Sequence, residues 1–396
     1  RRKRRRGLVW VDVVATRTLE TTLDAFIEMA TGCGLARLPP QRLVVPYFHG
    51  EFNRCVEHRA LNDLLDMPVE QGGSGWYQIG MACRISDTKK VEFGWHTTVF
   101  EMLTAIWRQE PVLVEHGQDE LATAMVELLT RGLGLDLKRL RVTYFGGGEV
   151  IPGLTLEPDE AGRSAFARAG LPAISLVPVR GPKNFVLFIG GGERTGPKYE
   201  IQYLLSNNPG DRWIEVATAI VDCYQWERRP DAGKWSLRRP RSVLTGCALG
   251  VERLTAAQLD AGDVWVSPVL HDLLAAIREA ATQDIATEEV LGGDRLILAD
   301  LVRSTMFLLA DGAGEDGRSA ESRLLQSMLR RIRRKAALLC VSDWAGLVEC
   351  LSALVVKHYH RRYPTIDAGK TRLLSTVSRV VWPEGWNPDS YTRDGE

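Results

Sequence analysis

The chain has 396 residues, and its 50 basic and 50 acidic side chains give a formal net charge of zero at pH 7. Because the charges balance, any affinity for nucleic acid must come from local clusters, and a generally basic binding protein is excluded. Hydrophobic residues make up 45% of the chain, which is typical of a soluble protein of this length with two or three domains.

The sequence disfavours both a membrane-spanning helix and disulfide bonds. No apolar run approaches the roughly 18 residues of a membrane-spanning helix. The seven cysteines contain no C-x-x-C pair and are odd in number, which favours free thiols over disulfides or a zinc site. We therefore expect a cytoplasmic protein that makes no contact with a membrane.

The N-terminal part of the chain mixes helices and strands. Residues 1–6 are all basic, which is typical of a free chain end, with a nucleic-acid-binding tail as the alternative. Residues 17–30 place apolar side chains at helical spacing until Gly32 and Gly34 end the run. The predicted elements are a strand at 8–14, a helix at 17–30, strands at 42–48 and 77–86, an extended segment at 89–100, a helix at 118–132, a strand at 140–145 and a helix at 161–169.

The next part changes to strands and the last part to helices. Short Gly/Pro-rich links between successive strands, with little helix among them, indicate an antiparallel sheet. We therefore predict an α+β fold with an antiparallel sheet and flanking helices over residues 1–255, followed by an all-α domain over 256–396. The predicted strands are 174–179, 185–189, 199–205, 213–226 and 243–249, and the predicted helices are 265–283, 294–311, 320–341, 344–362 and 368–380.

Residues 296–335 form the most distinctive stretch. Its first helix has an apolar stripe and carries Asp300, Arg303 and Asp311, and its second helix is amphipathic and strongly basic. A row of cations in a neutral protein predicts an anionic partner, or a heavily paired acidic neighbour as the alternative. The row consists of Arg330, Arg331, Arg333, Arg334 and Lys335.

Three short motifs carry candidate chemistry, each with a plainer alternative. Three glycines at 190–192 precede Glu200, which suits a phosphate turn beside a Mg²⁺ ligand, although a simple hairpin is favoured by these residues alone. Arg253 follows a small-residue corner at 246–250, where an arginine neutralises a phosphate or forms a surface ion pair. His96 alternates with threonines on an extended segment and is more often structural than catalytic.

The three motifs and the helical stretch behind them resemble alanyl-tRNA synthetase, a class II aminoacyl-tRNA synthetase family, in one co-linear order. HTTVFEML is similar to the family's HHTFFEML, ALGVER to its GMGLER, and LADLVRSTMFLLADG to its IADHIRSCAFLIADG. The segments NFV, TGPKYEIQY, RWIEVAT and MLRRIRRKA also match in order. The stretches concerned are 96–103, 184–186, 195–203, 212–218, 248–253, 298–312 and 328–336, and the resemblance runs from about residue 50 to 380.

The resemblance implies ATP-dependent activation of an amino acid or related carboxylate as an acyl-adenylate, with transfer to an acceptor. It implies ATP and Mg²⁺ as cofactors, a class II synthetase-like sheet, and a helical domain similar to the one that recognises the tRNA acceptor stem. Arg253, Glu200 and Arg59 are the implied catalytic residues. The implied ATP ligands are Arg54, Arg59, His96, Glu101, Glu215 and Arg253; the metal ligands are Glu200 and Glu215; the substrate pocket is Val186, Gly246, Ala248 and Gly250; and the tRNA or anion contacts are Arg330, Arg331, Arg333, Arg334 and Lys335.

Four positions depart from the family pattern. In RCVEHRALND, at 54–63, Glu57 stands where the family has an arginine on the α-phosphate, and Arg59 is the nearest replacement. Gly246 replaces the aspartate that holds the substrate ammonium, a loss of about 1.5–3 kcal/mol for a charge-assisted hydrogen bond. Val186 replaces a pocket tryptophan, which enlarges the pocket, and Leu324 replaces the asparagine that reads the acceptor stem.

Two hypotheses follow from these departures. The first is a truncated, stand-alone relative without the editing and C-terminal domains, an adenylate-forming ligase that charges tRNA or makes an amide or ester with a small-molecule amine or hydroxyl. The alternative is a catalytically inactive paralogue that binds tRNA or a protein partner.

Overall fold

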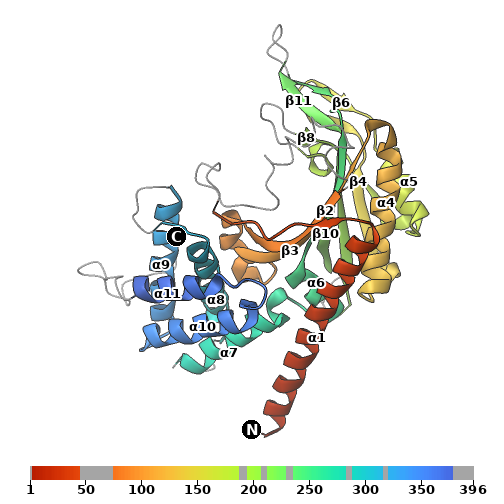
Figure 1. The fold of residues 1–396 in the computed structure, drawn as a ribbon. Coiled ribbons are helices and arrows are strands. Elements are labelled where there is room, and N and C mark those ends of the chain that lie inside the picture. The colour runs from red at the N-terminus through yellow and green to blue at the C-terminus, as the bar shows by residue number, and fades with distance from the viewer. Residues whose placement is uncertain are drawn as a thin grey trace.

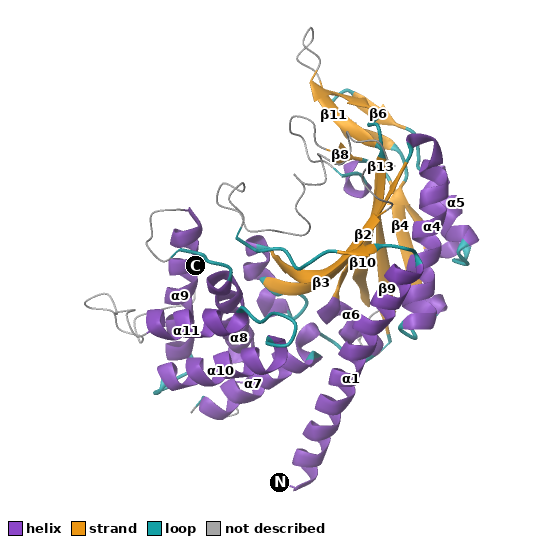
Figure 2. Cartoon of the chain, in the orientation of Figure 1, coloured by secondary structure: helices purple, strands orange, loops and turns teal. Residues whose placement is uncertain are grey.

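The computed structural model of the chain describes residues 2–44, 75–186, 194–206, 212–228, 235–281, 288–314 and 320–377. A curved sheet occupies one side of the molecule and a group of helices the other (Figures 1 and 2). None of the described helices is long and apolar enough to cross a membrane.

The main sheet has eight strands in the order β1-β2-β3-β13-β10-β9-β4-β7. Pairing is antiparallel at the centre and parallel only in the two outermost pairs, β1–β2 and β4–β7. The predicted antiparallel sheet is therefore confirmed. Its strands are β1 (Ala36–Arg37), β2 (Gly75–Cys83), β3 (Val99–Gln109), β4 (Leu140–Phe145), β7 (Leu176–Val179), β9 (Lys198–Leu205), β10 (Arg212–Asp222) and β13 (Val243–Gly250).

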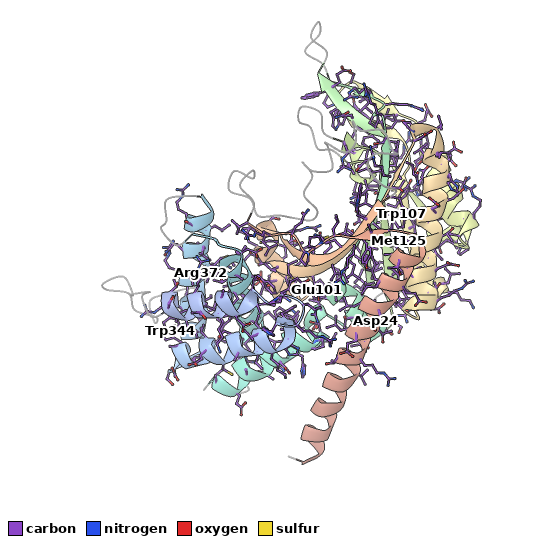
Figure 3. The ribbon with its side chains drawn as sticks, viewed as in Figure 1. Asp24, Glu101, Trp107, Met125, Trp344 and Arg372 are labelled. Atoms are coloured by element: carbon purple, nitrogen blue, oxygen red, sulfur yellow. The ribbon has the colours of Figure 1, made fainter. Side chains whose placement is uncertain are left out.

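One face of this sheet is covered by helices, because alternate residues of each strand are apolar. Leu103, Leu249 and Ala217 are direct neighbours across three strands and belong to the core. Trp107 of β3 and Met125 of α4 belong to the same core (Figure 3). The covering helices are α1 (Arg2–Gly32), α4 (Val114–Glu127), which continues as a π-helical turn (Leu128–Gly132), α5 (Glu160–Arg168) and α6 (Val251–Gln258).

A smaller set of strands extends the sheet at one end. It has its own core of Phe145, Val150, Phe185 and Trp226, separate from the main one. The strands are β8 (Arg194–Thr195), β11 (Tyr224–Arg228) and β12 (Trp235–Arg238), with a hairpin of β5 (Gly148–Ile151) and β6 (Leu154–Leu156).

The helical part is centred on α8, which packs against the helices around it and against the start of β3. Helix α11 approaches α8 so closely that a Cβ on Gly369 would lie 2.3 Å from the backbone oxygen of Met306. The predicted domain boundary at 255 falls within α6, and one hydrophobic core runs through both parts. The helices are α7 (Pro268–Ala280), α8 (Glu288–Ala310), α9 (Ala320–Leu338), α10 (Trp344–Tyr359) and α11 (Ile366–Val377).

Three of the element predictions are wrong in whole or in part. Residues 8–14 lie within α1 and not in a strand, because no glycine or proline interrupts the chain between them and the amphipathic helix that follows. Residues 89–100 are not extended throughout, since Ile85–Phe93 is a 3₁₀-helix that ends at Gly94 with a φ of 80°. Residues 42–44 of the predicted strand at 42–48 are irregular, and the rest lies outside the described residues.

Candidate functional site

The face of the main sheet opposite α4 and α5 carries most of the predicted site residues. Glu200, Thr218 and Ala248 are neighbours across β9, β10 and β13, one step along each strand from the core-facing residues. Gly246 lies two residues from Ala248 on the same face. The strands thus bring the predicted metal ligand and the predicted pocket residues together on one open face.

Val186 is held beside the segment that leads into β9 by the 3₁₀-turn that follows β7. Asn184 is fully buried there, and its Nδ2 donates to the backbone oxygens of Thr143 and Lys198, each at 3.0 Å. Val186 follows directly, is 7% exposed, and donates its backbone N–H to Gly196. The predicted pocket residue is therefore held by a specific amide anchor between β4 and β9.

Arg253 reaches the open face from the first turn of α6. The helix begins immediately after β13, with Gly250 as its N-cap residue. Nε of Arg253 donates to the backbone oxygen of Trp95 at 3.3 Å, and Nη1 donates to the backbone oxygen of Glu215 at 3.2 Å. Its ion pair with the Glu215 carboxylate is loose, at 3.7 Å, and the side chain remains 27% exposed.

His96 lies near this arginine, just before β3. Burial lowers the pKa of the imidazole below its usual value of 6.5, and the charges of Arg253, Lys90 and Arg84 lower it further, while Asp87 opposes them. The pKa shift therefore favours a neutral imidazole at neutral pH. His96 and Arg253, which lie far apart in the sequence, thus belong to one electropositive site.

One further arginine at this site, Arg84, was not predicted. The guanidinium of Arg84 lies over the Phe100 ring, 5.2 Å from its centroid; burial lowers the pKa of both His96 and Arg253, and the charge of Arg84 helps to lower it further. Arg212 lies over the Trp95 ring at 4.6 Å, but it is paired with the core residue Leu205 and its charge acts on Asp263. Arg84 makes no ion pair with a carboxylate of the described residues. Arginines held on aromatic rings without an anionic partner are suited to an anionic ligand.

Glu200 is already neutralised by lysines. Lys198 Nζ lies 3.1 Å from its Oε1 and Lys183 Nζ lies 3.5 Å from its Oε2. A cation so close competes with a metal ion for the carboxylate. Glu215 is more open, at 36% exposed, and one of its oxygens accepts the Thr218 hydroxyl.

The described residues hold no ready-made metal centre. No group of three or more histidine, cysteine, aspartate or glutamate side chains with metal-binding geometry occurs in this part of the chain. Mg²⁺ binds through one or two carboxylates together with water and substrate phosphates, so a fully protein-lined cage is not required. Glu215 fits such a role as it stands, whereas Glu200 fits it only if Lys183 and Lys198 move away.

The prediction that Glu101 lines the ATP site is wrong. Glu101 is 2% exposed and lies on the covered face of the sheet. Its carboxylate accepts from Arg362 Nε at 2.9 Å, Arg362 Nη2 at 3.2 Å and the Tyr363 hydroxyl at 2.9 Å. Residues alternate across a strand, so Glu101 points into the helical part and away from His96. The predicted Arg54 and Arg59 lie outside the described residues.

The basic row on α9 is only partly exposed. Arg330 is exposed, Arg331 and Arg334 are half-buried, and Arg333 lies over the Trp344 ring at 5.3 Å. Lys335, by contrast, is 7% exposed and its Nζ lies 2.8 Å from Asp294 Oδ1. The prediction of Lys335 as an outward anion contact is wrong, because helical spacing places it on the buried stripe of Ile332.

The family of the chain follows from comparison with known proteins. The family model described as tRNA synthetases class II (A) matches residues 85–384. The chain belongs to the class II (A) tRNA synthetases. The match begins after β2, at the 3₁₀-helix, and runs to beyond α11, so it takes in most of the sheet and the helical part of this class II chain.

Named relatives of this class II chain are alanine–tRNA ligases. The mitochondrial alanine–tRNA ligase of Mus musculus is 28% identical over 290 residues, covering 72% of this chain and 28% of that protein. The alanine–tRNA ligase of Granulibacter bethesdensis is 29% identical over 261 residues, covering 63% of this chain and 27% of that protein. The resemblance to alanyl-tRNA synthetase is therefore confirmed, and the chain spans under a third of the length of these relatives.

Proposed function

We propose that this chain uses ATP to activate an amino acid or a related carboxylate as an acyl-adenylate, with release of pyrophosphate, and passes the acyl group to an acceptor. The single observation that carries the proposal is the pair of cations at the open face, Arg253 at the start of α6 and Arg84 near it. Membership of the class II (A) tRNA synthetases supports the same chemistry. A triphosphate is the polyanion that such a pair fits.

The chain's own residues would act by positioning and charge neutralisation. Arg253 is held by the backbone oxygens of Trp95 and Glu215, so its guanidinium is oriented before a ligand arrives. The His96 imidazole, neutral at neutral pH, is suited to hydrogen bonding rather than to adding charge. A bound Mg²⁺ would supply further neutralisation of phosphate charge, with Glu215 as the carboxylate best placed to hold it.

The acyl substrate would lie between Gly246, Ala248, Gly250 and Val186. Gly246 offers no carboxylate for an α-ammonium group, and the Cβ of any larger residue there would lie 3.1 Å from the Ala105 backbone oxygen. Val186 leaves more room than a tryptophan. We therefore propose an acid that is larger than alanine, or one that lacks an α-ammonium group.

The acceptor is tRNA or a small-molecule amine or hydroxyl. The exposed Arg330 and the half-buried Arg331, Arg333 and Arg334 support contact with a phosphate backbone. The altered pocket supports a specialised amide- or ester-forming enzyme. The second candidate, an inactive paralogue that binds tRNA or a protein, is favoured by the lysines that neutralise Glu200 and by Glu57 in place of a phosphate-binding arginine.

The experiment is ATP–pyrophosphate exchange with a panel of the standard amino acids and of carboxylic acids that lack an α-ammonium group. Exchange stimulated by at least one acid supports the enzyme proposal, and ribonuclease sensitivity of product formation then separates a tRNA acceptor from a small molecule. Absence of exchange with every acid, together with measurable tRNA binding, would overturn it in favour of the inactive paralogue.

A further inference from the structure

A buried group of charged side chains joins α8 to the sheet beneath the candidate site. Arg303 of α8 has no exposed surface. Its Nη1 donates to Glu252 Oε1 and to the Tyr359 hydroxyl, both at 3.1 Å, and its Nη2 donates to the backbone oxygen of Val99. Arg303 therefore connects α8, α10, α6 and β3 at one point.

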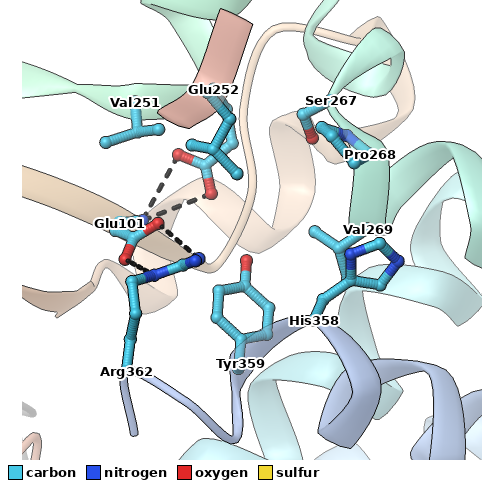
Figure 4. A pocket seen from close by; sticks show the side chains of 10 residues that line it. Glu101, Val251, Glu252, Ser267, Pro268, Val269, His358, Tyr359 and Arg362 are labelled. Atoms are coloured by element: carbon cyan, nitrogen blue, oxygen red, sulfur yellow. Dashed lines mark hydrogen bonds and ion pairs between the residues drawn. The ribbon is translucent and has the colours of Figure 1, made fainter. Parts of the chain in front are cut away.

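Glu252 links Arg303 to the first turn of α6. Its carboxylate accepts the backbone N–H of Glu101 at 3.2 Å and 3.3 Å, which fixes the start of α6 on β3. Glu252 and Glu101 line one small pocket with Tyr359 and Arg362 (Figure 4). The residue after Glu252 is Arg253, so the orientation of the helix start also sets the orientation of the phosphate-site arginine.

A second contact from α8 holds the other wall of the site. Asp300, one turn before Arg303, accepts the backbone N–H of Thr98 at 2.9 Å. Thr98 and Val99 follow closely on Trp95, whose backbone oxygen accepts Nε of Arg253 at 3.3 Å. Asp300 and Arg303 together hold both the segment that receives Arg253 and the helix that carries it.

The pairing of Arg303 with Glu252 is electrostatically sensitive. Burial raises the pKa of Glu252, and Arg303 opposes that shift. Burial alone would lower the pKa of Arg303, but its neighbours Tyr359, Glu252 and Asp300 raise it overall. Removal of Arg303 leaves both Glu252 and Asp300 buried without this counter-ion, which favours a rearrangement at the start of α6.

We propose that Arg303 is a positioning residue for Arg253, so that the helical part of the chain completes the nucleotide site on the sheet. This inference rests on the proposed function, because it assigns Arg253 to ATP phosphates. Arg303 itself does not reach the open face. It acts through Glu252 on the first turn of α6 and through Val99 on the segment that receives Arg253.

The test compares Arg303→Met and Arg303→Lys with a matched control, Arg372→Met. Arg372, on α11, likewise binds backbone oxygens of the helical part, at Leu309 and Ala313. In exchange assays, Arg303→Met should raise the KM for ATP, or lower kcat, about tenfold to a hundredfold, since small misplacements of this kind cost that much. Arg303→Lys should recover part of the loss, and Arg372→Met should lower thermal stability without changing the KM for ATP.

A second readout does not depend on activity. Arg253 lowers the pKa of His96, so displacement of Arg253 in Arg303→Met should raise the His96 pKa in an NMR titration, whereas Arg372→Met should leave it unchanged. If the wild-type chain fails to exchange or to bind ATP, the proposed function fails, yet the His96 titration still reports whether Arg303 positions Arg253. Should Arg303→Met not fold, Glu252→Gln removes the same ion pair with little change of shape. An unchanged His96 pKa and an unchanged KM in a folded variant overturn the inference.

Discussion

Glu252 and Arg253 are consecutive residues whose side chains lie toward opposite faces of the sheet. Glu252 is buried against Arg303 and the backbone of Glu101, whereas Arg253 lies against Trp95 and Glu215 on the open face. The first turn of α6 therefore contributes one side chain to the protein interior and the next one to the candidate site. A substitution at Glu252 is therefore expected to shift the Arg253 side chain, and a substitution at Arg253 to affect the packing of Glu252.

Replacement of Arg253 by alanine should reduce ATP–pyrophosphate exchange by roughly tenfold or more, because a preoriented phosphate ligand is lost. The fold should persist, since the side chain is 27% exposed and packs on backbone oxygens rather than in the core. Arg131→Ala is the matched control, because the Arg131 side chain is 81% exposed and pairs with Glu127, one helical turn away. Unchanged exchange in a folded Arg253→Ala variant would remove Arg253 from the site.

The imidazole of His96 should titrate below its usual pKa of 6.5, because burial and the cations around it disfavour the charged form. Arg253→Ala removes one of these cations, so the His96 pKa should rise. Binding of pyrophosphate brings negative charge and should raise it as well. Binding at a pH just below the usual value should therefore take up protons, which calorimetry in buffers of different ionisation enthalpy measures. Proton release on binding, or a pKa that is insensitive to Arg253→Ala, would separate His96 from the anion site.

Local patterns predicted the elements and part of the site, and long-range pairing decided the rest. Arg253 was predicted because the corner between β13 and α6 lies within a few residues of sequence. Arg84 was missed because it follows β2, and only the pairing of β2 with β3 brings it to Phe100. Glu101 was assigned to the wrong face because the face depends on where β3 begins and how it pairs, which its residues alone do not specify.

In the helical part, too, local sequence patterns predict the elements but not the contacts between them. Spacing along α9 predicted an amphipathic helix, which is confirmed, but not which cations face α8. Asp300 and Arg303 stood out in the sequence as charged residues in an apolar helix. Their partners, at Thr98, Val99 and Glu252, come from elements far away along the chain, so no local pattern reveals them.

Two cations of α9 should respond differently to substitution. Lys335→Met should lower the free energy of unfolding by about 3 kcal/mol, because it leaves Asp294 largely buried without this counter-charge. Arg330→Ala should change the free energy of unfolding by less than about 0.5 kcal/mol, since Arg330 is exposed. Chemical denaturation measures both values.

The same two substitutions should affect RNA binding in the reverse order of their effects on stability. Arg330→Ala should weaken binding of tRNA and reduce the slope of log affinity against log salt by about one, as expected when one phosphate contact is lost. Lys335→Met, assayed well below its unfolding temperature, should leave both quantities near the wild-type values, because its ammonium group faces Asp294 rather than solvent. A loss of RNA affinity in Lys335→Met that matches the loss in Arg330→Ala would mean that α9 binds RNA through its overall charge, and not through its exposed arginines.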